Sequence, residues 1–270
     1  MTIEQLNPLY TFQTFIVGLH NQFAHAGALA VAEALGRTYN PFYIYGGDSE
    51  TRTHLLHAIG HEIVTRHRQA RLLYISAHQF IKELKDARSR SRSSKFPELG
   101  RGFGTRAIQT REDYCNYHVL LVDNIQDLIN QEGAQEELLY IFDSLYNSQR
   151  QMVFSSDRRP RELNAVERLQ SRFEWGLIAD MEPMDRETLV ATLRRMAEIK
   201  KINLTDNVAF LIADKLKSLT NYSDYTRIRS LGLILETLDK FRAKASSSLN
   251  KYDLINEVIL KSRKRSLPAR

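Results

Sequence analysis

The chain has 270 residues, which is enough for one large domain or two modest ones with a proper hydrophobic core. An apolar content of 43% and a charged content of 26% are ordinary for a globular protein in water, and no apolar run approaches the ~18 residues that suggest a membrane span. The first residues have neither the basic nor the apolar region of a signal peptide, and the single cysteine excludes an intramolecular disulfide. We therefore expect a cytoplasmic protein without a membrane partner.

The excess of positive charge is local. Between residues 82 and 111, nine basic side chains stand against three acidic ones, and the difference equals the formal net charge of +6 of the whole chain. Such a block indicates a polyanionic partner more strongly than a diffuse excess would, and a solvated basic surface is the alternative. The candidate nucleic-acid-binding residues of this block are Lys82, Lys85, Arg88, Arg90, Arg92, Lys95, Arg101 and Arg106.

Short apolar runs rich in β-forming residues alternate with helical patterns over the first two thirds of the chain. The runs predict strands at residues 42–45, 72–75, 119–122, 152–154 and 176–179. Helical spacing of apolar residues predicts helices at 54–66 and 135–145, and one near 163–170. This alternation is typical of an α/β fold with a parallel sheet covered by helices on both faces.

The pattern becomes purely helical after residue 183. Helices are predicted at residues 185–200, 205–216, 225–244 and 252–261. We expect an α/β domain over residues 1–184, with a basic insert at about 82–117, then a helical domain over 185–262 and a basic tail over 263–270. Within the insert, the run RSRSRSSK at residues 88–95 indicates a mobile basic loop.

The first predicted strand is followed by the layout of a P-loop, G-x-x-x-x-G-K-[ST]. Gly46 and Thr53 occupy the first and last positions, and Gly47 follows the first. Thr51 stands where the second glycine belongs, and Arg52 stands where the lysine belongs. The motif is therefore present in outline and altered at its centre.

Each change in this loop acts against phosphate binding. In a P-loop, backbone N–H groups converge on the phosphates and the lysine adds a compact charge. Thr51 is expected to be strained if its position needs φ > 0, and Arg52 is larger and forked. Asp48 and Glu50 add carboxylates to a loop that binds anions, unless they point outward. The loop predicts either a plain strand–turn–helix corner or weak, altered nucleotide binding.

Several segments carry a family resemblance. In chain order they are LNPLYTFQTFIVGLHNQFAHAGALAVAEA, YNPFYIYGG, THLLHAIG, HVLLVDNIQDL, VFSSDRRPREL and ERLQSRFEWGLIADMEP. Their order and spacing resemble the AAA+ ATPase module of bacterial DnaA, the replication initiator, and of its short relative Hda, from residue 6 to about residue 261. The resemblance implies a parallel sheet of strand order 5-1-4-3-2 followed by a small all-helical lid domain. It also implies ATP or ADP with Mg²⁺ as cofactor, provided that the altered site still binds, with Gly46, Gly47, Arg52, Thr53 and Asp123 as the contacts.

A second motif of this chemistry is HVLLVDN. An apolar strand that ends at Asp123 would present a carboxylate at the carboxyl edge of the sheet, where it would hold Mg²⁺ through water. The next residue normally carries the carboxylate that polarises the attacking water, and here it is Asn124, which cannot accept a proton. Hydrolysis therefore loses its base independently of the changes in the loop.

The resemblance implies roles for two further residues. Asp157 in VFSSD matches the polar residue that senses the γ-phosphate, and a turn cap is the alternative. Arg172 in SRFEW matches the arginine finger, which acts on the γ-phosphate of a neighbouring subunit. The alternative for Arg172 is an ion pair with a carboxylate of its own chain. In DnaA the region of the basic insert binds single-stranded DNA. The resemblance therefore implies the same ligand for the basic block of this chain.

His54, His57 and His61 share one face of a predicted helix, but the family carries two of them without metal, so no metal site is expected. Together these features predict a DnaA-like protein of bacterial replication initiation or its regulation, a pseudo-ATPase that binds DnaA, single-stranded DNA or both. Its expected partners are DnaA or another AAA+ subunit, single-stranded DNA, and a sliding clamp or helicase. The alternative is an active, divergent ATPase that serves as an initiator or a helicase-loading factor.

Overall fold

The structure is a computed structural model that describes residues 6–93, 111–182, 186–199, 201–202 and 204–217. The chain divides into two compact units, residues 1–182 and 183–270, and each is described by itself. Among the described residues, no helix is both long and apolar enough to cross a membrane.

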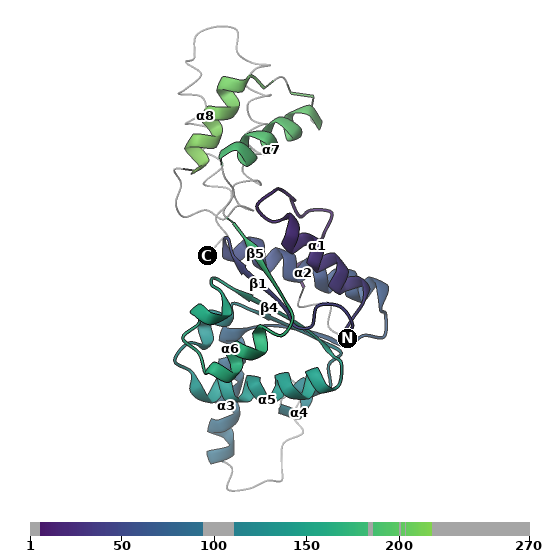
Figure 1. Cartoon of the computed structure of the whole chain (residues 1–270), viewed down its shortest axis with the longest axis vertical. Helices are drawn as coiled ribbons and strands as arrows, with labels where there is room; N and C mark the ends of the chain where they lie inside the picture. The colour runs from purple at the N-terminus through teal and green to yellow at the C-terminus, as the bar shows by residue number, and fades with distance from the viewer. Residues whose placement is uncertain (1–5, 94–110, 183–185, 200, 203, 218–270) are drawn as a thin grey trace. The chain divides into compact units, whose positions relative to one another are not determined.

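A five-stranded parallel sheet forms the centre of the first unit (Figure 1). Its strands are β1 (Phe42–Gly46), β2 (Leu72–Ser76), β3 (Val119–Asp123), β4 (Gln151–Ser156) and β5 (Leu177–Met181). Their order is β2-β3-β4-β1-β5, so β2 and β5 form the two edges. This is the predicted order read from the opposite edge, and all five predicted strands are confirmed.

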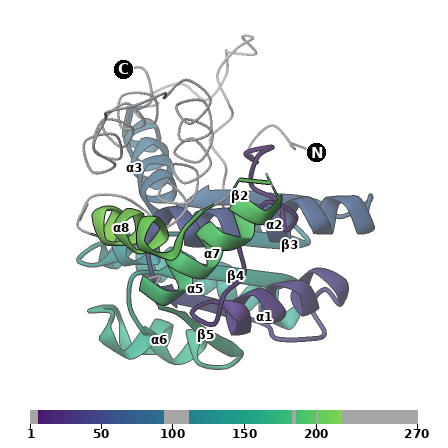
Figure 2. The same ribbon diagram turned by 90° about the horizontal axis from the view of Figure 1, so that it is seen from above.

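Helices cover both faces of the sheet (Figures 1 and 2). One face packs against α1 (Gln22–Glu33) and α2 (Ser49–Arg66), and the other against α3 (Ala77–Ser93), α4 (Arg111–Cys115), α5 (Glu132–Asn147) and α6 (Glu167–Phe173). Successive side chains of a strand point to opposite faces, so Phe42 and Ile44 join the core under α1 and α2, and Tyr43 joins the core under α5 and α6. Burial on both faces explains why the strands are continuous apolar runs.

Two predicted boundaries are wrong. Helix α2 begins at Ser49 rather than at residue 54, because Asp48 caps it one turn earlier. Helix α3 continues to Ser93, although a loop was predicted from residue 88. The run of arginine and serine contains no glycine or proline that would stop a helix, and arginine is a good helix former.

The described part of the second unit contains α7 (Arg186–Ile199) and α8 (Asp206–Lys217). The two helices pack together through buried Leu189, Leu193 and Ile212. Arg186 pairs with Asp214 across them at 2.5 Å. Both helices match the predicted ones to within one residue at each end. The helices predicted at 225–244 and 252–261 and the basic tail lie outside the described residues.

Candidate functional site

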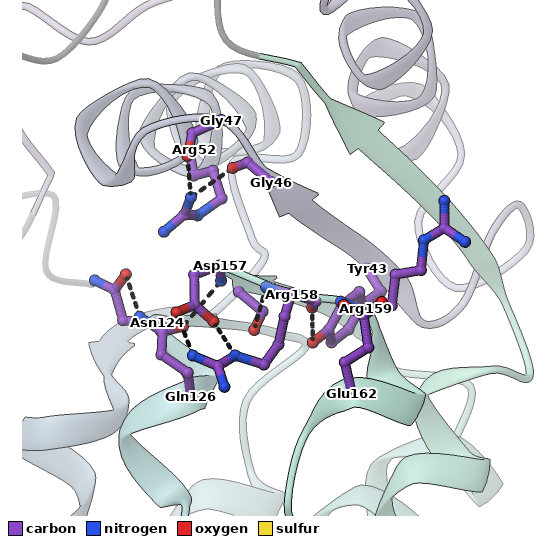
Figure 3. Close-up of polar contacts among 11 residues, drawn as sticks. Tyr43, Gly46, Gly47, Arg52, Asn124, Gln126, Asp157, Arg158, Arg159 and Glu162 are labelled. Atoms are coloured by element: carbon purple, nitrogen blue, oxygen red, sulfur yellow. Dashed lines mark hydrogen bonds and ion pairs between the residues drawn. The ribbon is translucent and has the colours of Figure 1, made fainter.

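The altered P-loop, Asp123 and Asp157 meet at the carboxyl ends of three strands. Gly46 ends β1, Asp123 ends β3, and Asp157 follows β4, which lies between those two strands. In open parallel sheets, ligands bind outside the carboxyl ends of the strands. The structure therefore brings the two sequence motifs together at this edge of the sheet, where Figure 3 shows Gly46, Gly47, Arg52, Asn124 and Asp157.

The turn after β1 is short because α2 starts early. Gly46 and Gly47 have φ of +79° and +54°, and a Cβ atom at Gly46 would lie 2.5 Å from the carbonyl oxygen of Met181, so only glycine fits there. Thr51 lies within α2 and has no positive φ. The expected strain at Thr51 is thus absent, because the central positions of the motif are wound into the helix rather than held in a loop.

Asp48 occupies the N-terminus of α2. Its carboxylate accepts a hydrogen bond from the backbone N–H of Thr51 (2.9 Å) and another from the Thr51 hydroxyl (2.7 Å). Helix N-termini favour negative charge and are the usual place for a bound phosphate. Here a carboxylate of the chain itself takes that position. The sequence contained the signal, since an aspartate before a helix is a common N-cap, but its role was missed.

Arg52 is turned inward. Its Nη1 donates hydrogen bonds to the carbonyl oxygens of Gly46 (2.5 Å) and Gly47 (3.1 Å), and the side chain is only 2% exposed (Figure 3). Among the described residues, its buried Nε has no hydrogen-bond partner. Burial lowers the pKa of Arg52, and the nearby Asp123, Asp157 and Asp48 act in the opposite direction. The guanidinium therefore serves the turn itself rather than facing outward as a P-loop lysine does.

Asp123 is buried among hydroxyl groups. It accepts hydrogen bonds from Thr53 Oγ1 (2.5 Å), from Tyr74 OH (2.8 Å) and from Ser155 Oγ. Burial, and then the charge of Asp123, raise the pKa of Tyr74, which keeps its hydroxyl a donor. Sequence analysis found Thr53 and Asp123 but missed Tyr74 and Ser155. Their contacts depend on strand neighbours, and no local pattern indicates them.

Asn124 has a left-handed backbone, with φ of +58° and ψ of +54°. Asparagine and aspartate are the residues that best tolerate this conformation after glycine. The side-chain oxygen accepts hydrogen bonds from Ser49 Oγ and from Gln126 Nε2, both at 3.1 Å. A carboxylate at this position could accept the same two bonds, so the backbone does not by itself select asparagine.

Asp157 faces Arg158 in a two-pronged ion pair. Arg158 donates from Nε and Nη2 to the two carboxylate oxygens, both at 2.7 Å, and this hydrogen bonding lowers the pKa of Asp157. Gln126 accepts a hydrogen bond from the backbone N–H of Asp157 at 3.2 Å. Tyr43 donates to the carbonyl oxygen of Arg158 and holds the turn from the core side (Figure 3). Asp157 is exposed and lies near Arg52 without a direct ion pair to it.

The histidines of α2 hold the N-terminal segment, residues 6–15, against the helix. His57 Nδ1 accepts a hydrogen bond from the backbone N–H of Asn7 at 3.0 Å, and His61 bonds the carbonyl oxygen of Asn7 at 2.9 Å. His54 stacks on Tyr10 with ring centres 4.7 Å apart. No cluster suited to a metal ion occurs among the described residues.

Arg172 lies apart from these groups, near the end of α6 and beside α5. Its guanidinium pairs with Asp143 and stacks on Trp175, which is 47% exposed. Of the basic insert, Lys82 and Lys85 are exposed on α3. The side chains of Arg88, Arg90 and Arg92, and the whole of Lys95, Arg101 and Arg106, lie outside the described part.

The sheet order and the P-loop layout define an AAA+ domain of the P-loop NTPase class. The profile of the bacterial DnaA ATPase domain matches residues 6–180. The chain is 42% identical over 217 residues to the chromosomal replication initiator protein DnaA of Caldanaerobacter subterraneus subsp. tengcongensis, covering 80% of this chain and 46% of that protein. The chain belongs to the bacterial DnaA ATPase-domain family.

Solved structures agree with this assignment. Domain III of DnaA from Thermotoga maritima has a TM-score of 0.69 and 33% identity, and the match covers 95% of this chain and 98% of that one. AMPPCP-bound DnaA from Aquifex aeolicus has a TM-score of 0.68 and 28% identity, covering 97% of this chain and 72% of that one. The chain spans about half the length of the curated relatives it matches, 46% for the one above.

Proposed function

We propose that this chain is a pseudo-ATPase module of replication initiation or its regulation, which binds an AAA+ partner such as DnaA. The observation that carries the proposal is the inward-facing Arg52. Arg52, which stands at the position of the phosphate-binding lysine, is 2% exposed and donates its hydrogen bonds to the carbonyl oxygens of the preceding turn. A triphosphate needs hydrogen-bond donors that point towards it, whereas the guanidinium of Arg52 points towards backbone carbonyl oxygens of its own chain.

Three further features support the loss of nucleotide binding. The loop amides that would cradle phosphate are wound into α2, and that of Thr51 is bonded to Asp48. The carboxylate of Asp48 would repel a phosphate at the helix N-terminus. Asp123 is 1% exposed and is surrounded by three donor hydroxyls, which leaves little room for magnesium and its water shell. The described residues therefore do not fit Mg-ATP in this conformation.

The absent base supports the same conclusion on separate grounds. Asn124 cannot accept a proton, and its side-chain oxygen is bonded to Ser49 and Gln126. Hydrolysis would lack a base even if the turn opened. The alternative, an active and divergent ATPase, draws on the DnaA structures that hold AMPPCP at 26–28% identity. Affinity for a fluorescent ATP analogue separates the two, since the pseudo-ATPase should bind it no better than a control protein.

The face that includes Arg172 supports a partner that carries the nucleotide. Arg172 and Trp175 lie at the surface, and arginine, tryptophan and tyrosine are the residues most enriched at the energetic centres of protein interfaces. An arginine supplied from a neighbouring subunit stabilises the charge on the transferred phosphoryl group. Docked on an ATP-loaded DnaA, this chain would promote hydrolysis there, or end a DnaA filament.

Single-stranded DNA is a second proposed partner. A DnaA structure at 26% identity, covering 96% of this chain, contains AMPPCP and single-stranded DNA. The exposed Lys82 and Lys85 on α3 begin the basic block. Affinity should fall with salt, with a slope of roughly −0.7 per phosphate neutralised, and changing Arg88, Arg90, Arg92 and Lys95 to serine should reduce the slope by about 2–3. Unchanged binding in that variant would leave the block as a solvated surface.

The decisive test mixes the protein with full-length DnaA from the same organism, ATP and DNA, and follows phosphate release and filament length. Wild type should change at least one of them, and Arg172→Ala should change neither. Arg161→Ala is the matched control, because Arg161 is a nearby arginine that is 83% exposed and pairs with Glu174. If wild type and Arg172→Ala behave alike in both assays, the proposed action on DnaA is refuted.

A further inference from the structure

Arg172 is held on two sides by its own chain. Its Nε donates to Asp143 Oδ1 at 2.7 Å and its Nη2 to Oδ2 at 3.4 Å, which is the forked geometry of a guanidinium on a carboxylate. The guanidinium carbon also lies 4.2 Å from the centre of the Trp175 ring, within the range of a cation–π contact. The side chain is 20% exposed, against 83% for Arg161, which also carries an ion pair.

The supports of Arg172 are themselves fixed by packing. Asp143 lies on α5, next to Phe142, which is fully buried. The Trp175 ring packs at steep angles of 74° and 61° against Phe142 and Tyr146, with ring centres 6.0 and 4.9 Å away. Helices α5 and α6 are in contact, so packing fixes both the carboxylate and the indole ring that touch the guanidinium. This is a built arrangement rather than a chance surface ion pair.

We propose that Asp143 is a positioning residue. Its carboxylate keeps Arg172 bound to its own chain until a phosphate replaces that carboxylate as the partner of the guanidinium. The inference rests on the proposed function of Arg172. A carboxylate and a phosphate offer a guanidinium the same paired acceptors, so both compete for the same N–H groups. Asp143 is 37% exposed, and ion pairs between partly exposed groups are weak enough to exchange. A nucleotide phosphate carries more negative charge than one carboxylate and would win the exchange when a partner brings it within reach.

The exposed Trp175 can report on the contact between Arg172 and Asp143. It is the only tryptophan of the chain, so its emission reports on the guanidinium that covers it. Release of Arg172 from Asp143 should uncover the indole ring and raise its quenching by acrylamide. The isolated protein thus provides a measurement of the resting contact that needs no partner and no nucleotide.

The experiment compares Asp143→Asn, which keeps the shape but removes the charge, with Asp143→Glu, which restores the charge. Asp143→Asn should raise acrylamide quenching of Trp175 and increase the effect on ATP hydrolysis by full-length DnaA at least twofold at subsaturating protein. Asp143→Glu should stay close to wild type in both. Asp143→Asn combined with Arg172→Ala should have no effect on hydrolysis. Glu174→Gln is the matched control, because it breaks the neighbouring pair with Arg161 and leaves Arg172 untouched.

The outcomes separate the two proposals. Unchanged quenching in a folded Asp143→Asn variant, or a weaker effect on DnaA than wild type, would overturn the positioning role. If quenching rises but neither wild type nor the variant affects DnaA, the resting contact stands and the proposed action on DnaA fails. Thermal unfolding of each variant checks that the fold is retained, and Asp143→Glu keeps the test informative if the asparagine variant does not fold.

Discussion

Two regions of the α/β unit differ in how far their charged side chains are exposed to solvent. At the carboxyl edge of the sheet, Arg52 of α2 and Asp123 at the end of β3 are 2% and 1% exposed, and their hydrogen bonds go to the chain itself. On the face formed by the ends of α5 and α6, Arg172 is 20% exposed and Trp175 is 47% exposed. The first region has become part of the interior, and the second has stayed at the surface.

On the proposed function, this difference explains how the ATPase fold is stable without a bound nucleotide. A P-loop leaves several polar groups waiting for phosphate, and such groups are costly when nothing pairs with them. In this chain Asp48 bonds the N-terminus of α2 and Arg52 bonds the carbonyl oxygens of the turn, so these groups are paired within the chain, although the Nε of Arg52 has no partner among the described residues. The surface around Arg172 does not depend on those groups. On the proposed function, this surface serves a protein partner rather than a bound nucleotide.

The largest expected effect is on stability, at Arg52. Arg52→Ala should lower the free energy of unfolding by about 2–4 kcal/mol, because two charge-assisted hydrogen bonds are lost and a cavity remains. Burial lowers the pKa of Arg52, so the charge is costly to bury and the two carbonyl bonds must offset that cost. Urea unfolding provides the measurement. Arg161→Ala, at an exposed ion pair, should change the value by less than about 0.5 kcal/mol. Equal values for the two variants would contradict an interior role for Arg52.

The second expected effect is a pH dependence of stability that comes from His57 on α2 and not from the region around Arg172 and Trp175. His57 accepts a hydrogen bond from the backbone N–H of Asn7, and burial lowers its pKa to about 4. Asp123 opposes this shift, while His61 and His54 add to it. Because the folded-state pKa lies below the ordinary value of 6.5, the unfolded chain takes up the proton first. The stability from neutral His57 is complete above pH 6.5 and is lost as the pH falls towards 4.

Between pH 7 and pH 5 the contribution of His57 should fall by about 2 kcal/mol. It is measured as the difference between the urea-unfolding curves of wild type and His57→Gln, because burial also lowers the pKa of His25, His54 and His118. His57→Gln removes the titrating group and should flatten the curve by most of that amount. No histidine occurs between residues 167 and 175, so the emission of Trp175 in the folded protein should not change over this range. A change in Trp175 emission before unfolding would show that the two regions are coupled.

Most of the fold could be predicted from the sequence, and the reason is physical. Strands buried on both faces leave continuous apolar runs, and the family resemblance supplied the strand order. The start of α2 was missed by five residues because the P-loop pattern outweighed the capping signal at Asp48. The helical structure from Arg88 to Ser93 was missed because composition alone indicated a loop.

The sequence predicted which residues form the candidate site, but not which groups those residues contact. The motifs identified Arg52, Asp123 and Asn124, yet burial of an arginine runs against its usual preference for the surface. The partners of Arg52 are backbone carbonyls, which no side-chain pattern encodes. Likewise, Asp143 became visible only when α5 packed beside α6 and brought it to Arg172. Contacts of this kind depend on tertiary structure and follow from the folded coordinates alone.

The smallest expected effect is a gain of nucleotide binding by the turn. Thr51→Gly should unwind the first turn of α2, since glycine disfavours a helix interior by roughly 0.5–1 kcal/mol. Arg52→Lys removes the fork that holds the turn carbonyls, and Asn124→Asp restores a base in a backbone conformation that aspartate tolerates. The structure adds Asp48→Gly, which frees the helix N-terminus.

The triple variant with Thr51→Gly, Arg52→Lys and Asn124→Asp should gain weak ATP affinity, and Asp48→Gly should strengthen it. With a Kd of about 100 µM, 1 mM ATP with Mg²⁺ would raise the free energy of unfolding by about 1.4 kcal/mol, measured as a shift of the urea midpoint. Wild type should show no shift. Adding Thr53→Ala to the variant should cancel the gain, because the hydroxyl of Thr53 lies beside Asp123 where the metal would bind. If wild type is stabilised by ATP as much as the variant, the turn was never closed to nucleotide. In that case the difference between the two regions is one of exposure only, and the active, divergent ATPase becomes the better description.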